Sequence, residues 1–149
     1  RFFKIPAERI SRAIAAYEPT NNRSQLKKTE NNELIIDAYN ANPSSMKVAL
    51  DNFATMPVSP KALILGDMRE LGPTSDELHT EVVARIKEGN YDKVFLCGEH
   101  FQKAAGKDFT TYATTEELIE ALCKNPLEGY HVLIKGSHGM ALERVVEVL

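Results

Sequence analysis

Residues 34–46 read LIIDAYNANPSSM, which is the most informative stretch of the sequence. Its first three residues are apolar, the run stops at an acid, and further polar side chains follow before Pro43. A short buried strand that ends in a polar loop and leads into a helix is typical of α/β sheets, which bind ligands at the carboxyl ends of their strands. The stretch therefore predicts an α/β fold with a ligand site. The side chains expected in that site are Asp37, Tyr39, Asn40 and Asn42.

Other short apolar runs have the same form and lie at residues 62–65, 94–97 and 131–134, with a weaker one at 109–112. These runs are continuous rather than alternating, which indicates strands that are buried on both faces and hence a largely parallel sheet covered by helices. Helical patterns fall between them, at residues 43–54, 75–88, 100–105, 115–124 and 140–148.

The first two strands of the domain are expected to pair differently from the others. Residues 23–29 and 33–37 flank the short polar turn Glu30–Asn32, which predicts an antiparallel hairpin. The expected fold class is therefore α/β, a Rossmann-like, doubly wound, mostly parallel sheet with an antiparallel strand or hairpin at one end.

Composition excludes several classes of protein. With 149 residues, of which 43% are hydrophobic, the chain can form about one domain with its own core. A net charge of −3 argues against a nucleic acid or a membrane surface as partner. No apolar run approaches the roughly 20 residues that cross a bilayer, and the two cysteines suit reduced thiols in the cytoplasm.

The amino-terminal segment indicates a piece of a longer protein. The chain begins with Arg1 rather than methionine, and residues 1–22 have the pattern of one helix followed by a Thr-Asn-Asn linker. We therefore expect residues 1–22 to be the end of a preceding domain and residues 23–149 to form the domain proper.

Glycines and charged residues follow the buried strands, in the segments 66–72, 98–100 and 135–139. Each loop alone is explained by the needs of α/β turns, but together with the loop at Asp37 they predict one shared site at the edge of the sheet. The phosphate-binding signatures Gly-x-x-x-x-Gly-Lys-Ser/Thr and Gly-x-Gly-x-x-Gly are absent. Three loop acids could hold Mg²⁺, but such carboxylates are usually only solvated, and we assign no metal site. These acids are Asp67, Glu70 and Glu99.

Three motifs, at residues 37–46, 65–72 and 134–137, together resemble the carboxyl-terminal domain of the Mur ligases, and the resemblance covers essentially the whole chain. They are most similar to those members that add D-Ala-D-Ala to UDP-N-acetylmuramoyl-tripeptide in peptidoglycan synthesis. The resemblance implies a cytoplasmic, monomeric, three-domain enzyme that forms an amide at the expense of ATP through an acyl phosphate. It also implies that a central domain carries the P-loop and most of the Mg²⁺ ligation, so that this chain alone is inactive.

The resemblance further implies roles in ATP binding for five residues. Arg23, after the junction-like Tyr17-Glu18-Pro19, would reach the nucleotide with a permanently charged, planar group. Asp37 would accept hydrogen bonds from the ribose hydroxyls. The remaining motif residues, Tyr39, Asn40 and Asn42, would line the cleft.

The glycine turn after the last strand is expected to receive the dipeptide carboxylate, through Lys135, Ser137 and His138. Many members of the family have arginine where this chain has His138. An imidazole with a reference pKa of about 6.5 is only partly charged at neutral pH, so the resemblance is weakest at this contact.

Two other readings compete with a ligase domain. A free-standing Rossmann-like module for a nucleotide or small acid fits the fold class, although the missing glycine fingerprint weighs against it. Strong stabilisation by NAD and not by ATP would favour such a module. A domain that only mediates protein contacts would need an exposed apolar patch, and the polar loops argue against it.

Overall fold

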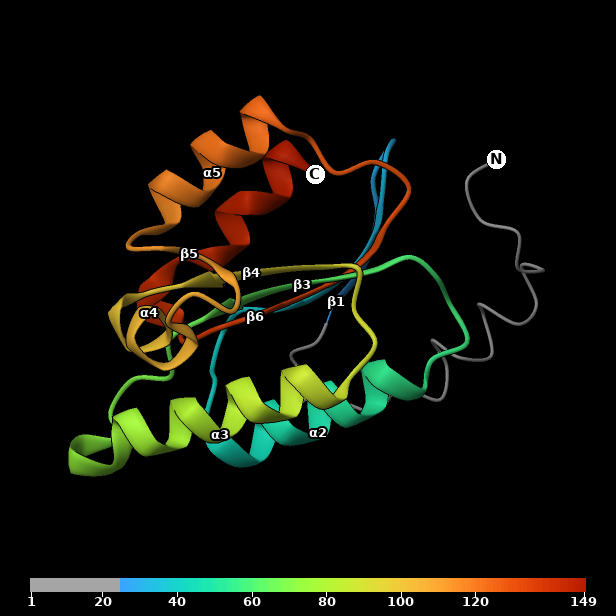
Figure 1. Cartoon of the computed structure of the whole chain (residues 1–149). Coiled ribbons are helices and arrows are strands. Elements are labelled where there is room, and N and C mark those ends of the chain that lie inside the picture. Colours follow the sequence, from blue (N-terminus) through green and yellow to red (C-terminus); the bar gives the residue numbers. More distant parts are fainter. Residues whose placement is uncertain (1–24) are drawn as a thin grey trace.

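The computed structural model describes residues 25–149. Within them, helices flank a single six-stranded sheet (Figure 1). The strands are β1 (Gln25–Lys28), β2 (Glu33–Asp37), β3 (Lys61–Gly66), β4 (Lys93–Cys97), β5 (Thr110–Tyr112) and β6 (His131–Lys135). The α-helices are α2 (Pro43–Thr55), α3 (Ser75–Glu88), α4 (Glu99–Ala105) and α5 (Thr115–Lys124). Shorter 3-10 helices are η1 (Gly72–Thr74), η2 (His138–Met140) and η3 (Leu142–Val148).

The last strand in the sequence, β6, lies between β2 and β3, so the order across the sheet is β1-β2-β6-β3-β4-β5. β1 pairs antiparallel with β2, and every other neighbouring pair is parallel. The predicted sheet, mostly parallel with an antiparallel hairpin at one end, is thus confirmed. Because the parallel strands share one direction, their carboxyl ends open on the same edge. There the register sets Asp37 beside Lys135.

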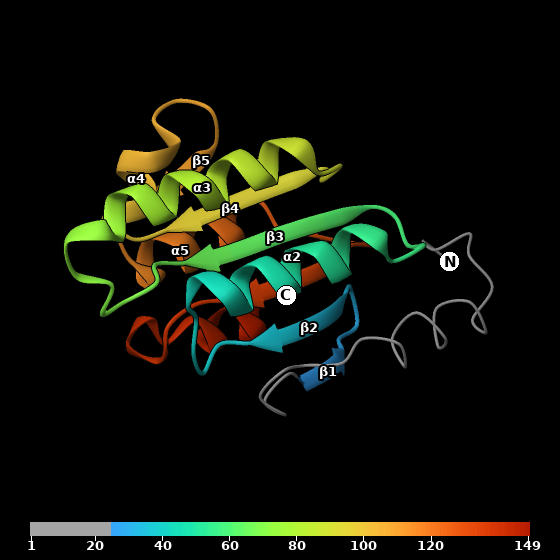
Figure 2. The ribbon, with the colours of Figure 1, turned by 90° about the horizontal axis from the view of Figure 1, so that it is seen from below.

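Side chains on the two faces of the sheet belong to two separate hydrophobic cores. Leu63 and Leu65 pack with residues of α2, α3 and α4, whereas Ile64 between them packs with α5 and η3. Figures 1 and 2 show α2 and α3 on one face of the sheet and α5 with η3 on the other. Since successive strand residues point to opposite faces, a strand covered on both needs an unbroken apolar run.

Two helix starts follow from the capping residues in the sequence. Asn42 accepts a hydrogen bond from the Ser45 N–H at 2.8 Å and donates its own N–H to the Ser45 hydroxyl at 3.1 Å, which forms a capping box before Pro43. Thr114 accepts from the Glu117 N–H at 3.2 Å at the start of α5. Each bond satisfies a backbone group that the first helical turn leaves unpaired.

The helix predicted for residues 140–148 is confirmed for Leu142–Val148, where it is a 3-10 helix, and Met140 belongs to the preceding helix η2. Ala141 adopts a left-handed conformation with φ of +50°, and it separates η2 from η3. Leu142 and Val145 are both fully buried and lie three residues apart. That spacing fits a 3-10 helix, which has about three residues per turn.

No helix in residues 25–149 combines the length and the apolar character that crossing a membrane requires. The helix and linker expected for residues 1–22, and also Arg23, lie outside the described residues. The proposed domain boundary at residue 23 therefore stays a prediction.

Candidate functional site

The loops after β2, β3, β4 and β6 meet at one edge of the sheet. The Asp67 N–H donates to the Cys97 carbonyl at 3.0 Å, and the Ser137 N–H donates to the Asp67 carbonyl at 3.3 Å. A Cβ at Gly136 would lie 3.1 Å from the Cα of Gly66. Because both positions are glycine, the ends of β3 and β6 can touch, and the loops form one continuous surface.

A buried ion pair lies at the centre of this surface. The Lys135 ammonium donates to Asp37 Oδ2 at 2.8 Å and to the Asn40 carbonyl at 3.1 Å. The Lys135 side chain is fully buried, and that of Asp37 is 7% exposed. The second carboxylate oxygen, Asp37 Oδ1, is buried and accepts no hydrogen bond from any described residue. It is therefore an acceptor that a ligand hydroxyl or amine could satisfy.

The other polar residues of the first motif have different surroundings. The Asn42 side chain caps α2, which by itself explains an asparagine at that position. The Asn40 side chain is exposed, and its carbonyl belongs to the Lys135 contact. Tyr39 is 51% exposed, and its ring centroid lies 5.2 Å from that of His138. Nucleotide contacts by these residues stay a prediction.

The residues expected at the dipeptide carboxylate are engaged within the domain. Ser137 is buried, and its hydroxyl oxygen accepts the Arg69 N–H at 2.9 Å. His138 lies beside Tyr39, and Lys135 is held by Asp37. Their roles in dipeptide binding are likewise untested and stay predictions.

Asp67 fixes the start of α4. Its Oδ2 accepts the His100 N–H and its Oδ1 accepts the Phe101 N–H, both at 3.0 Å. This carboxylate binds the positive end of the helix, where a negative charge is stabilising. Gly98, with φ of +116°, lets the chain pass so close that a Cβ there would lie 2.2 Å from Asp67 Cγ. The acid and the glycine thus form one structural unit.

His79 is a structural residue behind the site, and sequence reasoning missed its role. Its imidazole is fully buried in α3, where Nε2 accepts the Met68 N–H at 3.0 Å. Nδ1 must then carry the proton, and it donates to the Ser75 carbonyl at 2.7 Å. Burial lowers the pKa of His79, although the bond to Ser75 opposes this shift. The neutral ring therefore holds the loop after β3 against α3, a role that no motif spacing indicates.

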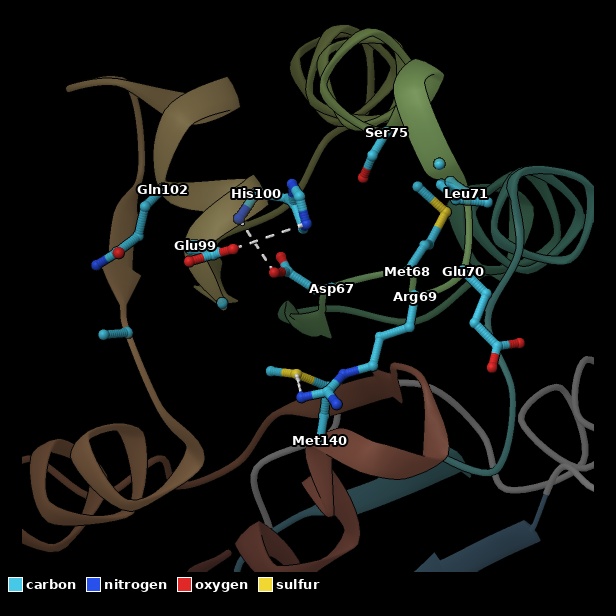
Figure 3. Close-up of a pocket in the computed structure, with 13 residues that line it drawn as sticks. Asp67, Met68, Arg69, Glu70, Leu71, Ser75, Glu99, His100, Gln102 and Met140 are labelled. Carbon is cyan, nitrogen blue, oxygen red and sulfur yellow. Dashed lines mark hydrogen bonds and ion pairs between the residues drawn. The ribbon is translucent and has the colours of Figure 1, made fainter.

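A pocket of about 660 Å³ opens between the loops after β3 and β4, as Figure 3 shows. Arg69 and Glu70 contribute charged groups from one loop, and Glu99 and His100 contribute from the start of α4. The His100 Nδ1 lies 3.2 Å from the Asp76 carboxylate, a contact that lowers the pKa of Asp76.

The described residues do not fit a Mg²⁺ site. Residues 25–149 contain no group of three or more His, Cys, Asp or Glu side chains placed to hold a metal ion. Both oxygens of Asp67 already accept backbone hydrogen bonds, and Glu70 and Glu99 are exposed. These three acids are therefore not arranged to hold Mg²⁺ within residues 25–149.

Comparisons with known proteins agree with this architecture. The family model of the Mur ligase glutamate ligase domain matches residues 22–138. UDP-N-acetylmuramoyl-tripeptide–D-alanyl-D-alanine ligase of Bacillus subtilis is 34% identical over 161 aligned residues, which cover 99% of this chain and 35% of that protein. The ligase of the same name from Escherichia coli is also 34% identical, over 80% of this chain and 27% of its own length. The chain thus spans about a third of these relatives.

Solved structures share the fold. MurF ligase from Thermotoga maritima in complex with ADP aligns with a TM-score of 0.72 at 24% identity, covering 90% of this chain and 31% of that one. A domain of a UDP-N-acetylmuramate:L-alanyl-γ-D-glutamyl-diaminopimelate ligase from Haemophilus ducreyi, solved by itself, aligns with a TM-score of 0.56 at 13% identity. It covers 84% of this chain and 98% of its own. Together with the family match, these findings mean that the chain belongs to the Mur ligase family, as its carboxyl-terminal domain.

Proposed function

We propose that residues 23–149 are the carboxyl-terminal domain of an ATP-dependent ligase that joins D-Ala-D-Ala to UDP-N-acetylmuramoyl-tripeptide, and that residues 1–22 end its central domain. The proposal places the enzyme in the cytoplasm, in the synthesis of the peptidoglycan precursor. It is supported by relatives of that name that align with nearly the whole chain at 34% identity. The domain alone is expected to be inactive, because it supplies one wall of the site.

The observation that carries a nucleotide role is the unsatisfied oxygen of Asp37. Lys135 holds Oδ2, so Oδ1 is kept in place at the sheet edge without a donor from the described residues. A ribose offers two adjacent hydroxyl donors, and a carboxylate is an acceptor with fixed geometry. We assign the ribose to Asp37, the phosphates to Arg23, and the neighbouring cleft to the 39–42 loop.

The chemistry is divided between domains in this proposal. ATP supplies the phosphoryl group that activates the precursor carboxylate for attack by the dipeptide amine. The residues of this chain bind and orient the reactants, and Mg²⁺ is assigned to the central domain. The reading frame upstream of Arg1 should therefore encode Gly-x-x-x-x-Gly-Lys-Ser/Thr. A reading frame without a P-loop would contradict the proposal.

Kinetics of the full-length ligase test the nucleotide assignment. Asp37→Asn keeps an oxygen for Lys135 but turns the other acceptor into a donor, so the KM for ATP should rise by about tenfold, as expected for loss of one charge-assisted hydrogen bond. The KM values for both peptide substrates should change little. Asp92→Asn is the matched control, since Asp92 accepts the Lys61 N–H at the opposite edge of the sheet. An unchanged KM for ATP in Asp37→Asn removes Asp37 from the nucleotide site.

A further inference from the structure

The guanidinium of Arg69 is positioned beside the glycine turn after β6 without an ionic partner. Its backbone N–H is fixed by the Ser137 hydroxyl at 2.9 Å. Its Nη2 lies 3.8 Å from the Met140 sulfur, and a Cβ at Gly139 would come within 2.9 Å of Nη1. No carboxylate of residues 25–149 forms an ion pair with it. These contacts of the exposed guanidinium are with neutral groups, so its positive charge remains available to bind an anion.

The other polar side chains near this turn already contact other residues of the domain. The Lys135 ammonium is buried against Asp37, and the Ser137 hydroxyl accepts from the Arg69 backbone. His138 lies beside Tyr39 and does not line the pocket. Among the described residues around the turn, Arg69 is therefore the permanent cation that an incoming anion can meet.

The pocket beyond Arg69 carries both signs of charge. Of its described lining residues, Arg69 alone is Lys or Arg, while Glu70 and Glu99 are exposed acids. Figure 3 shows the Arg69 side chain reaching toward Met140, with Glu99 on the far side of Asp67. Both carboxylate oxygens of Asp67 already accept backbone N–H groups. Glu70 and Glu99 are therefore the pocket acids that can attract an ammonium. A pocket with separate basic and acidic walls suits a zwitterion.

We propose that Arg69 binds the carboxylate of the incoming dipeptide and thereby selects a substrate with a free carboxyl terminus. This assignment rests on the proposed ligase function and deepens it. A guanidinium presents paired N–H donors that match both carboxylate oxygens, which the imidazole at position 138 does not. Gly139 leaves the space that the guanidinium occupies.

The test compares D-Ala-D-Ala with its carboxyl-terminal amide as acceptors for the full-length ligase. Wild-type enzyme should prefer the acid by about 10- to 100-fold in kcat/KM, the range for a hydrogen-bonded charge pair. In Arg69→Met this ratio should fall toward one through a higher KM for the acid, with the KM for ATP unchanged. Arg69→Lys should keep part of the preference. Gly139→Ala retains every polar group but displaces the guanidinium, so it should lower the ratio partially.

Arg144→Met is the matched control, because Arg144 is an exposed arginine that pairs with Glu116 away from the pocket. It should keep the wild-type ratio. The proposal is overturned if Arg69→Met prefers D-Ala-D-Ala over its amide as strongly as the wild-type enzyme does. It is also overturned if Arg69→Met raises the KM for the UDP-linked precursor and leaves the KM for the dipeptide unchanged. A wild-type enzyme that uses neither acceptor instead overturns the ligase function itself, so the two failures are distinguishable.

Discussion

Replacing Lys135 by methionine should destabilise the domain by about 3–5 kcal/mol at neutral pH, the usual result of breaking a buried ion pair at one end. The ammonium makes two hydrogen bonds, at 2.8 Å to Asp37 and 3.1 Å to the Asn40 carbonyl. Each bond to a charged group contributes about 1.5–3 kcal/mol, so two bonds give about 3–6 kcal/mol, which overlaps that range. Methionine keeps much of the aliphatic stem, so the loss reports the charge rather than a cavity.

A double-mutant cycle separates the ion pair from other effects of the substitution. Asp37→Leu alone leaves the Lys135 ammonium buried with a single carbonyl partner, so it should also be costly. The double variant, which buries neither charge, should be more stable than the sum of the single effects by at least about 2 kcal/mol. The free energy of unfolding is measured by urea titration of the chain followed by circular dichroism, with equal m-values as the check on two-state behaviour.

The exposed Lys124→Met serves as the control and should change the free energy of unfolding by less than about 0.5 kcal/mol. Two outcomes would contradict a buried, interacting ion pair. One is a loss below about 1 kcal/mol in Lys135→Met, which would mean that water reaches the Asp37 carboxylate. The other is strict additivity in the cycle, which would mean that the two groups do not interact.

Three further outcomes follow from buried groups. Burial, helped by the Lys61 charge, lowers the pKa of His131 to about 4 from 6.5, so the fold favours the neutral ring. The unfolded chain then binds the extra proton first, so stability should fall as pH drops through that window, by less than the roughly 3 kcal/mol of the full shift because Glu33, 3.4 Å from Nδ1, stabilises the charged ring. His131→Leu should flatten this part of a pH series of urea titrations. Gly98→Ala should lower stability by at least about 2 kcal/mol, because φ is +116° and the Asp67 carboxylate at the start of α4 occupies the position of a Cβ. Gly106→Ala, with φ of +56° and open space, should lose less than Gly98→Ala because only backbone strain of about 1–3 kcal/mol applies there, and equal losses in thermal melts would contradict this. Burial also raises the pKa of the Cys97 thiol to about 11, so iodoacetamide should alkylate the exposed Cys123 and spare Cys97 until urea is added. Rapid labelling of both thiols would count against the buried assignment.

The strands and most helices could be predicted because their signals are local. Continuous apolar runs mark strands covered on both faces, and Asn42 and Thr114 mark helix starts. The type of the last helix could not be predicted, because the apolar spacing of residues 140–148 fits an α-helix and a 3-10 helix alike. The left-handed Ala141 separates η2 from η3, a break that the apolar pattern does not indicate.

The residues at the sheet edge could be predicted, but their pairing could not. Asp37 and Lys135 are 98 positions apart and meet only because β6 enters the sheet beside β2. The sequence does not indicate that Lys135, expected at the dipeptide, also donates a hydrogen bond to Asp37, expected at the ribose. The roles of Arg69 and His79 could not be predicted from the sequence. Arg69 depends on its contact with Ser137, and His79 depends on its contact with the loop after β3.

The insertion of β6 at the centre of the sheet also constrains how the chain can assemble. Before residue 131 has been synthesised, β1-β2 and β3-β4-β5 have no shared edge, because β2 and β3 each pair with β6 and not with each other. On the ribosome the sheet must therefore wait for its last strand, and such late, sequence-distant pairing is slow to form. Until then the flanks of β2 and β3 are open edges, exposed to chaperones or to another nascent chain.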